Sequence, residues 1–237
     1  MHAAILLAGG SGRRMGSAVS DKLLHPIGST NAFRLSCEAF LKASSIDHFV
    51  LVFRDESQRK EIKKEFDLAS AKTGRQVPCL VVKGGKERQN SVSNALSACD
   101  RSCEYVHVHD CARPMIRHET IELLVDKVSE SGAIAVARPL TDSIRKTLQP
   151  SLDPQIPQKT ECHDRSILWL METPQAARKD WLEDGLRNAE SKGLLVTDEL
   201  SAIELTERKA AFLDPGYPNP KITRESDLAY VEYLLKT

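Results

Sequence analysis

The sequence lacks the features that mark several protein classes. No window of the 237 residues approaches the roughly 20 apolar residues that span a bilayer. Lysines and arginines number 33, as do aspartates and glutamates, so no net charge attracts nucleic acid or an anionic membrane. Six cysteines are spread from Cys37 to Cys162 without a C-x-x-C pair. We therefore expect reduced thiols and neither a nucleic-acid nor a membrane partner.

Three common catalytic or nucleotide-binding motifs are also missing. There is no G-x-S-x-G elbow of a serine hydrolase and no Gly-Lys-Ser/Thr of a Walker A loop. The dinucleotide pattern G-x-G-x-x-G fails because Met15 stands where its third glycine belongs, which disfavours a nicotinamide-dependent oxidoreductase. The chain begins Met1-His2 and runs into a short apolar segment without the basic region of a signal peptide, so we expect it in the cytoplasm.

Short apolar runs alternate with segments of helical period through the first 137 residues. This alternation is typical of βαβ units around a parallel sheet, so the predicted fold class is α/β. The expected strands are residues 3–8, 49–53, 79–82, 105–108, 133–137 and 210–213. The expected helices are residues 31–42, 56–68, 89–99, 118–129, 179–188, 197–205 and 225–235.

The alternation stops after Arg138. Four prolines follow within about twenty polar residues that show no clear period, and a structureless loop of that length is unusual inside a compact domain. We expect one domain over residues 1–237, with an arm at about residues 138–176 inserted in it. A partner subunit is the simplest surface for the arm to pack on.

A glycine-rich segment directly follows the first expected strand. It reads Ala8-Gly9-Gly10-Ser11-Gly12-Arg13-Arg14-Met15, and Lys22 comes shortly after. Glycines let several backbone N–H groups approach one anion, and the cations suit a triphosphate. The alternative is a tight turn with solvated arginines.

Two further segments lie where expected strands end. In Gly84-Gly85-Lys86-Glu87-Arg88, with Ser91 after it, the backbone can read the edge of a base, although a glycine turn into a helix is common. In Val106-His107-Val108-His109-Asp110-Cys111-Ala112-Arg113, the carboxylate of Asp110 can hold Mg²⁺ against phosphate oxygens. A zinc set of Cys103, His107, His109 and Cys111 is an alternative, but no second ligand pair has closed spacing.

Taken in order, these segments resemble the 2-C-methyl-D-erythritol 4-phosphate cytidylyltransferases of non-mevalonate isoprenoid biosynthesis. The resemblance spans essentially the whole chain. It continues through Thr173-Pro174-Gln175, Thr197-Asp198-Glu199 and Lys221-Ile222-Thr223. It departs at Asp21-Lys22-Leu23, where family members usually show Pro-Lys-Gln, so Asp21 could weaken the local field of Lys22.

The resemblance implies a Rossmann-like, mostly parallel sheet of the nucleotidyltransferase type. It also implies a homodimer in which each arm reaches the partner's active site. The implied reaction is cytidylyl transfer from CTP to the sugar phosphate with Mg²⁺, which needs no general base because the attacking phosphate oxygen is already anionic.

The resemblance also implies roles for individual residues. The implied catalytic residues are Arg14, Lys22, Arg165 and Lys221. The implied nucleotide-binding residues are Ala8, Gly9, Gly10, Gly12, Gly85, Lys86, Ser91, Asp110 and Arg113. The implied substrate-binding residues are Ser143, Arg165, Thr197 and Lys221, and Asp110 is the implied metal ligand.

Two other functions stay open on the sequence. The closest is a ribitol 5-phosphate cytidylyltransferase, which shares a similar glycine-rich loop, Asp-x-x-Arg and Thr-Pro-Gln. The paired Arg13-Arg14 and the Asp-Cys-Ala-Arg segment favour the methylerythritol substrate. The other is a nucleotide-binding protein that kept the fold and lost catalysis.

Overall fold

A computed structural model describes residues 1–10, 21–148, 153 and 155–236. Seven strands form its central sheet, in the order β11-β7-β10-β6-β1-β4-β5. All neighbouring strands are parallel except that β10 runs antiparallel to both β6 and β7. The strands are β1 (His2–Leu7), β4 (His48–Phe53), β5 (Cys79–Lys83), β6 (Tyr105–Asp110), β7 (Ala133–Pro139), β10 (Trp169–Arg178) and β11 (Ala211–Leu213).

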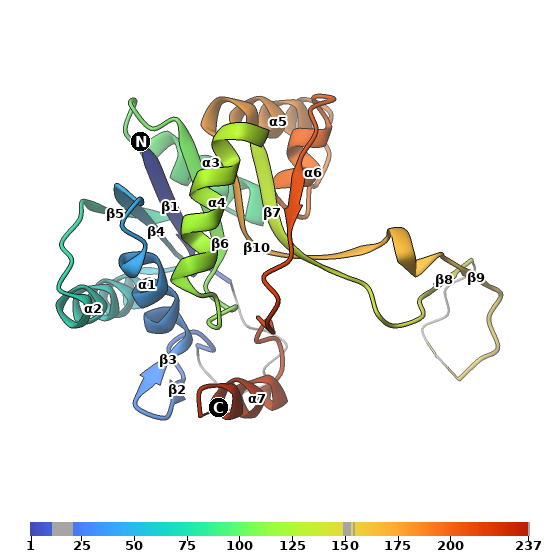
Figure 1. The fold of residues 1–237 in the computed structure, drawn as a ribbon, viewed down its shortest axis with the longest axis horizontal. Helices are drawn as coiled ribbons and strands as arrows, with labels where there is room; N and C mark the ends of the chain where they lie inside the picture. The colour runs from blue at the N-terminus through green and yellow to red at the C-terminus, as the bar shows by residue number, and fades with distance from the viewer. Residues whose placement is uncertain (11–20, 149–152, 154, 237) are drawn as a thin grey trace.

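Strands β1 and β4 are apolar after their first histidine because helices cover both faces of the sheet (Figure 1). Successive side chains of a strand alternate between the two faces. In β1, Ala4 and Leu6 pack into one core cluster, whereas Ala3 and Ile5 pack into the other. Helices α1, α2, α4 and α7 contribute to the first cluster, and α3, α5 and α6 to the second.

The helices begin and end near the predicted residues. Asn31 caps α1 by accepting a hydrogen bond from the Arg34 backbone N–H, and Asp198 caps α6 in the same way. Helix α2 runs five residues beyond the prediction and ends at Gly74, which has a φ of +69°. The helices are α1 (Ala32–Lys42), α2 (Glu56–Thr73), α3 (Arg88–Ala98), α4 (His118–Ser131), α5 (Lys179–Ser191), α6 (Glu199–Glu204) and α7 (Glu225–Leu234).

The structure confirms the α/β class and the mostly parallel sheet. All six predicted strands are present, but the sheet also contains β10, which the sequence did not predict. Residues Gln175, Ala176 and Ala177 pair with both β6 and β7 in the interior of the sheet. The predicted arm boundary at residue 176 is therefore too late, and β10 belongs to the sheet from Trp169 onward.

The segment between β7 and β10 projects away from the sheet (Figure 1). It carries a small antiparallel pair of strands, β8 (Arg145–Thr147) and β9 (Thr160–Cys162), followed by a short 3-10 helix, η2 (Arg165–Ile167). A second small pair, β2 (Pro26–Ile27) and β3 (Thr30–Asn31), precedes α1. Among the helices in the described ranges, none is both long enough and apolar enough to cross a membrane.

Candidate active site

A pocket of about 890 Å³ lies at the carboxyl edge of the sheet. The strand order reverses at β1, which has β4 on one side and β6 on the other, and open α/β sheets bind ligands at such a point. The described residues that line the pocket are Leu7, Gly9, Gly10, Lys22, Leu23, Val52, Arg54, Gly85, Lys86, Glu87, Arg88, Ser91, Asp110, Ala112, Lys221 and Thr223. Eight of them are predicted site residues: Gly9, Gly10, Lys22, Gly85, Lys86, Ser91, Asp110 and Lys221.

Asp110, the last residue of β6, is the central anion of the pocket. Its Oδ1 accepts hydrogen bonds from Arg88 Nε at 3.2 Å and Nη2 at 3.1 Å, and its Oδ2 lies 2.5 Å from Lys221 Nζ. Burial disfavours the charged carboxylate, but the attraction of Arg88 and Lys221 outweighs it and holds the pKa of Asp110 well below its usual range. Asp110 is therefore ionised at neutral pH.

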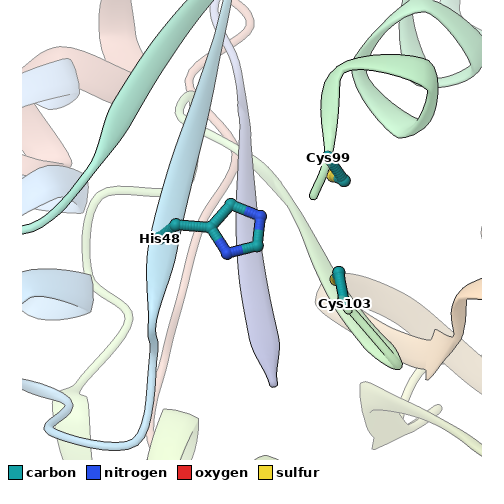
Figure 2. Close-up of side chains that lie close together, drawn as sticks. All are labelled: His48, Cys99 and Cys103. Carbon is teal, nitrogen blue, oxygen red and sulfur yellow. The ribbon is translucent and has the colours of Figure 1, made fainter. Parts of the chain in front are cut away.

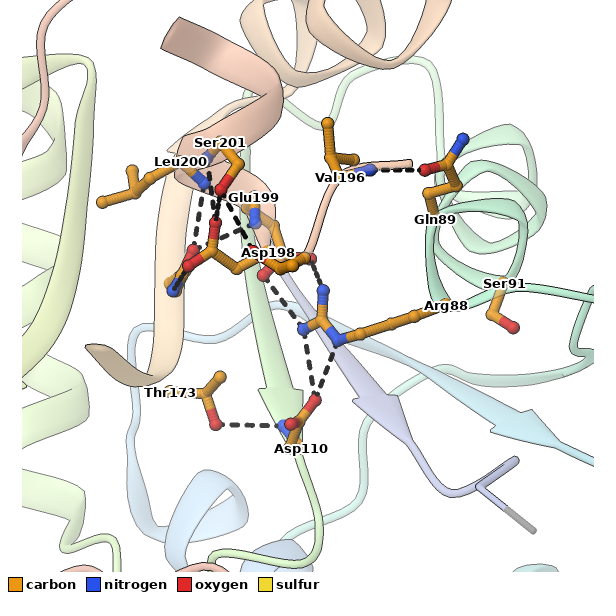
Figure 3. Close-up of polar contacts among 12 residues, drawn as sticks. Arg88, Gln89, Ser91, Asp110, Thr173, Val196, Asp198, Glu199, Leu200 and Ser201 are labelled. Atoms are coloured by element: carbon orange, nitrogen blue, oxygen red, sulfur yellow. Dashed lines mark hydrogen bonds and ion pairs between the residues drawn. The ribbon is translucent and has the colours of Figure 1, made fainter. Parts of the chain in front are cut away.

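Arg88 links Asp110 to a second, more deeply buried carboxylate (Figure 3). Its Nη1 donates to Glu199 Oε1 at 2.6 Å and its Nη2 to Oε2 at 3.1 Å. Burial raises the pKa of Glu199, while Arg88 opposes that rise. Despite burial, Glu199 and Asp110 raise the pKa of Arg88, which stays charged. The guanidinium thus joins the start of α3, the end of β6 and the start of α6.

Gln175 holds the start of α6 in place. Its Oε1 accepts hydrogen bonds from the backbone N–H groups of Glu199 and Leu200, each at 3.0 Å. These two donors at a helix start would otherwise lack a partner inside the helix. The buried amide of β10 therefore fixes where Glu199 presents its carboxylate to Arg88.

The segment after Asn219 closes the pocket from the other side. Ile222 is fully buried, and its backbone N–H donates to the Ala112 carbonyl oxygen at 2.8 Å. Its own carbonyl oxygen accepts a hydrogen bond from Lys22 Nζ at 2.8 Å. The buried Ile222 therefore brings Lys22 to the same pocket as Lys221, the residue that precedes Ile222, although the two lysines are far apart in the sequence.

The Gly84-Gly85 turn is shaped by close contacts. Gly84 N–H donates to the Phe53 carbonyl oxygen at 2.7 Å, and Gly85 N–H donates to Ser91 Oγ at 3.0 Å. A Cβ on Gly85 would lie 2.3 Å from Asn90 Cβ, so the turn requires glycine for its close approach to α3. Gly85 and Lys86 both line the pocket.

The described start of the glycine-rich loop is anchored to the sheet and to α2. Ala8 N–H donates to the Val52 carbonyl oxygen at 2.9 Å, and the Ala8 carbonyl oxygen accepts from Gln58 Nε2 at 3.0 Å. The same Nε2 lies 2.6 Å from Asp21 Oδ2, which Arg54 also contacts at 3.4 Å. The Asp21 carboxylate is therefore held by Gln58 and Arg54. Gly12 and Arg14, both predicted site residues, lie outside the described residues, as does Arg13.

Arg113 contacts protein groups beside the pocket. Its Nη1 donates to the Asn219 carbonyl oxygen at 2.9 Å and its Nη2 to the Met171 carbonyl oxygen at 3.3 Å. Its guanidinium also lies 3.7 Å from the buried Glu172 carboxylate. These contacts hold β10 and the segment before Lys221 beside the loop that follows β6, and a nucleotide-binding role for Arg113 stays a prediction.

Ala8 and three further predicted residues are not among the described residues that line the pocket. Ser143 and Arg165 lie on the projecting segment, where Arg165 Nη1 donates to the Thr141 carbonyl oxygen at 2.6 Å. Thr197 lies just before α6, with its hydroxyl 3.3 Å from Ser201 Oγ. One chain therefore does not bring Ser143 or Arg165 to its own pocket.

The alternative zinc set does not assemble. His107 and His109 are fully buried, but His107 Nε2 lies 3.1 Å from His2 Nδ1, and His109 Nδ1 lies 3.1 Å from the Thr173 hydroxyl. Within the described ranges, these histidines form no ligand group with Cys103 and Cys111.

Sequence reasoning assigned no role to Arg88, Glu199 or Gln175. All three stand inside segments that carried the resemblance, so the signal was present as motif membership. Their connection could not be read from the sequence because Arg88 and Glu199 are 111 residues apart.

Comparison with known proteins identifies the family. The family model described as 2-C-methyl-D-erythritol 4-phosphate cytidylyltransferase matches residues 2–237. The chain belongs to this family. It is accordingly a cytidylyltransferase, an enzyme of the nucleotidyltransferase class, and the resemblance read from its motifs is confirmed.

Two curated relatives of the cytidylyltransferase family match almost end to end. The 2-C-methyl-D-erythritol 4-phosphate cytidylyltransferase of Bacillus velezensis is 31% identical over 99% of this chain and 96% of its own length. That of Syntrophotalea carbinolica is 33% identical over 98% of this chain and 95% of its own length.

Solved structures of the family share the fold. The crystal structure of 4-diphosphocytidyl-2C-methyl-D-erythritol synthase from Anaerococcus prevotii has a TM-score of 0.81 at 21% identity, covering 100% of this chain and 99% of that one. The cytidylyltransferase of Francisella tularensis has a TM-score of 0.76 at 24% identity, covering 98% of each chain. At these identities the two structures support the fold alone.

Proposed function

We propose that this enzyme transfers the cytidylyl group of CTP to 2-C-methyl-D-erythritol 4-phosphate in the pocket at the carboxyl edge of the sheet. An oxygen of the substrate phosphate forms a bond to the α-phosphorus of CTP, and the bond from that phosphorus to the bridging oxygen breaks. Pyrophosphate leaves and a CDP-linked polyol remains. Family membership supports the overall reaction, and the pocket geometry supports the residue assignments.

The observation that carries the proposal is the gathering of cations around one carboxylate. Arg88, Lys221 and Lys22 all line the pocket with Asp110, and Arg88 and Lys221 pair with it directly. Two anionic substrates must approach each other during the reaction, so the protein has to neutralise charge and hold geometry rather than remove a proton. Lys22 and Lys221 do this in our proposal, together with Arg14.

The nucleotide would occupy the side of the pocket formed by the two glycine segments. Gly9 and Gly10 follow β1 and offer backbone N–H groups to the triphosphate. Gly85, Lys86 and Ser91 surround the cytosine in this arrangement. Ser91 Oγ already accepts from Gly85 N–H and donates to the Glu87 carbonyl oxygen at 3.2 Å, so the turn is held in shape before a base binds.

Asp110 fits a role as a magnesium ligand. Its carboxylate is ionised, faces the pocket and stands at the end of β6, and Mg²⁺ in nucleotide sites is commonly held by one or two carboxylates and substrate phosphate oxygens. Bound there, Mg²⁺ would neutralise phosphate charge. Lys221 pairs with Asp110 Oδ2, and its side chain is 38% exposed, so it can turn toward the phosphate of the sugar substrate.

The projecting segment supports a homodimer with exchanged arms. Its described residues include four exposed large apolar side chains, Ile144, Leu148, Ile156 and Ile167, and Trp169 and Leu170 at the adjoining start of β10 are exposed as well. Exposed large apolar side chains concentrated on one projecting segment favour a surface that another protein covers. Ser143 and Arg165 stand on the same segment, so a partner's arm would deliver both to the pocket in this proposal.

Pyrophosphate release measured over four nucleoside triphosphates and two polyol phosphates tests the reaction. We expect release only with CTP, and faster release with methylerythritol phosphate than with ribitol 5-phosphate. The reverse preference would support the ribitol enzyme. No release with any pair would support a protein that only binds nucleotides.

Alanine variants of Lys22 and Lys221 test the assignments. Each should lower turnover by about 10²–10³-fold while CTP binding by calorimetry persists. Lys127→Ala, on the exposed surface of α4, is the matched control and should match the wild type. Full turnover in both site variants would refute the roles of Lys22 and Lys221, but it would leave the proposed overall reaction unaffected.

A further inference from the structure

Three metal-ligating side chains lie together at the amino edge of the sheet, opposite the pocket. His48 is the first residue of β4, Cys99 is the C-cap of α3, and Cys103 shortly precedes β6. Their ligand atoms all lie within 4.8 Å of one another, and Figure 2 shows His48 projecting from its strand beside the two cysteines. Across the described ranges, this is the one such group of three or more His, Cys, Asp or Glu side chains.

The environment of His48 is independent evidence for a ligand at this group. The residue is 5% exposed, and neither ring nitrogen has a hydrogen-bond partner within the described part of the chain. Buried polar atoms in native proteins nearly always have one, so two orphaned nitrogens on a single side chain need an explanation.

The two cysteines have the spacing and placement of metal ligands. Three residues separate Cys99 from Cys103, within the two to four that are usual between paired cysteines of structural zinc sites. Both are buried and free of disulfides. Each sulfur contacts a backbone carbonyl oxygen. Cys99 Sγ lies 3.3 Å from the Ala95 oxygen, and Cys103 Sγ lies 3.2 Å from the Tyr105 oxygen.

We propose that His48, Cys99 and Cys103 bind one Zn²⁺ ion, with a solvent molecule as the fourth ligand. Two thiolates balance the charge of the ion and the imidazole is neutral, so the complex carries no net charge into a buried place. Each thiol loses its proton to solvent on binding. The turn between the two cysteines, which includes Asp100 and Ser102, is exposed, so the solvent molecule would reach the ion from that side.

The ion would act on structure rather than on the reaction. The site and the pocket lie at opposite ends of strands of about 20 Å. Helix α3 connects the two places, since it begins with Arg88 at the pocket and ends at Cys99. Zinc would fix the end of α3 to the starts of β4 and β6 and thereby support the position of Arg88.

Titration of the reduced, metal-free protein with Co²⁺, followed by competition with Zn²⁺, tests the site. Cobalt bound by thiolates in a tetrahedral site gives a charge-transfer band and strong visible bands, neither of which depends on enzymatic activity. We expect one equivalent bound per chain, displaced by Zn²⁺. Cys103→Ser and His48→Gln should each weaken Zn²⁺ binding by more than about 100-fold. Cys162→Ser, at an exposed cysteine, is the control and should bind like the wild type.

Three results would overturn the proposal. One is the absence of stoichiometric Zn²⁺ binding by the reduced wild type. Another is unchanged binding in both ligand variants. The third is a Cys99–Cys103 disulfide that persists in the reducing buffer, shown by thiol counts and mass spectrometry. Should a ligand variant fail to fold, the wild type and Cys162→Ser still decide, because Zn²⁺ must raise the unfolding temperature of both.

Discussion

Replacement of Arg88 by methionine tests the ion-pair network that organises the pocket. Methionine keeps a flexible aliphatic stem and removes the charge. The Glu199 side chain is 2% exposed and that of Arg88 is 28% exposed, so the substitution leaves a buried carboxylate without its cation. Breaking a buried ion pair costs about 3–5 kcal/mol of the free energy of unfolding. Because Arg88 is partly exposed, we expect about 3 kcal/mol, near the lower end.

A double-mutant cycle with Glu199→Gln separates the ion pair from general damage. Once Arg88 is methionine, neutralising Glu199 removes the unpaired charge, so the double variant should be more stable than the sum of the single losses by about 2 kcal/mol. Without Arg88 the pKa of Glu199, already raised by burial, rises further. A raised carboxyl pKa gives stability at low pH that is lost as the pH rises, so the Arg88→Met defect should shrink on acidification.

Urea-induced unfolding followed by circular dichroism measures these differences, with the midpoint moving and the slope unchanged. Arg187→Met is the matched control, because its side chain is 75% exposed and pairs with Asp184 on the surface of α5. The control should lose about 0.5 kcal/mol or less. A loss that small for Arg88→Met, or strict additivity in the double variant, would refute the reasoning.

Three further predictions concern the turn, the arm and the central carboxylate. Gly85→Ala should lower the free energy of unfolding by about 1–3 kcal/mol and weaken CTP binding, because the new Cβ would lie 2.3 Å from Asn90 Cβ. Urea unfolding measures the stability and calorimetry measures CTP binding. Wild-type values in both measurements would contradict this prediction. Ile167→Asp should convert the proposed dimer to a monomer in light scattering, because Ile167 is 76% exposed on the projecting segment and a charge there would disrupt an apolar interface. A wild-type protein that is already monomeric would contradict the proposed dimer. Asp110 has a pKa below its ordinary 3.8, so its stabilising effect is present above that pH and lost as the pH falls through the lowered pKa. The stability advantage of the wild type over Asp110→Asn should therefore shrink in acid and stay constant near neutral pH.

The sequence predicted the parallel strands and their helices because their apolar patterns are strong. It failed at β10, whose centre reads Thr173-Pro174-Gln175-Ala176-Ala177. Proline and alanine are poor strand formers, and this strand is held by its neighbours on both sides rather than by its own residues. Tertiary context decided its conformation.

The candidate site was predictable in part. Segments that end strands of one parallel sheet must meet at one edge, so the approach of Gly85 and Asp110 follows from topology. The positions of Arg88 and Arg113 do not, because a guanidinium can reach several partners. Arg88 bridges two carboxylates that come from β6 and α6, whereas Arg113 contacts Asn219 and Met171 instead of lining the pocket.

The contact between Ile222 and Lys22 has a consequence for the timing of assembly during translation. The ribosome synthesises all seven strands of the sheet before it reaches residues 219–223. Until Ile222 is buried, its carbonyl oxygen is not in place to accept the hydrogen bond from Lys22, and Lys221 has not reached Asp110. A nascent chain can therefore form its sheet early, yet it gains a complete set of pocket cations only near the end of synthesis.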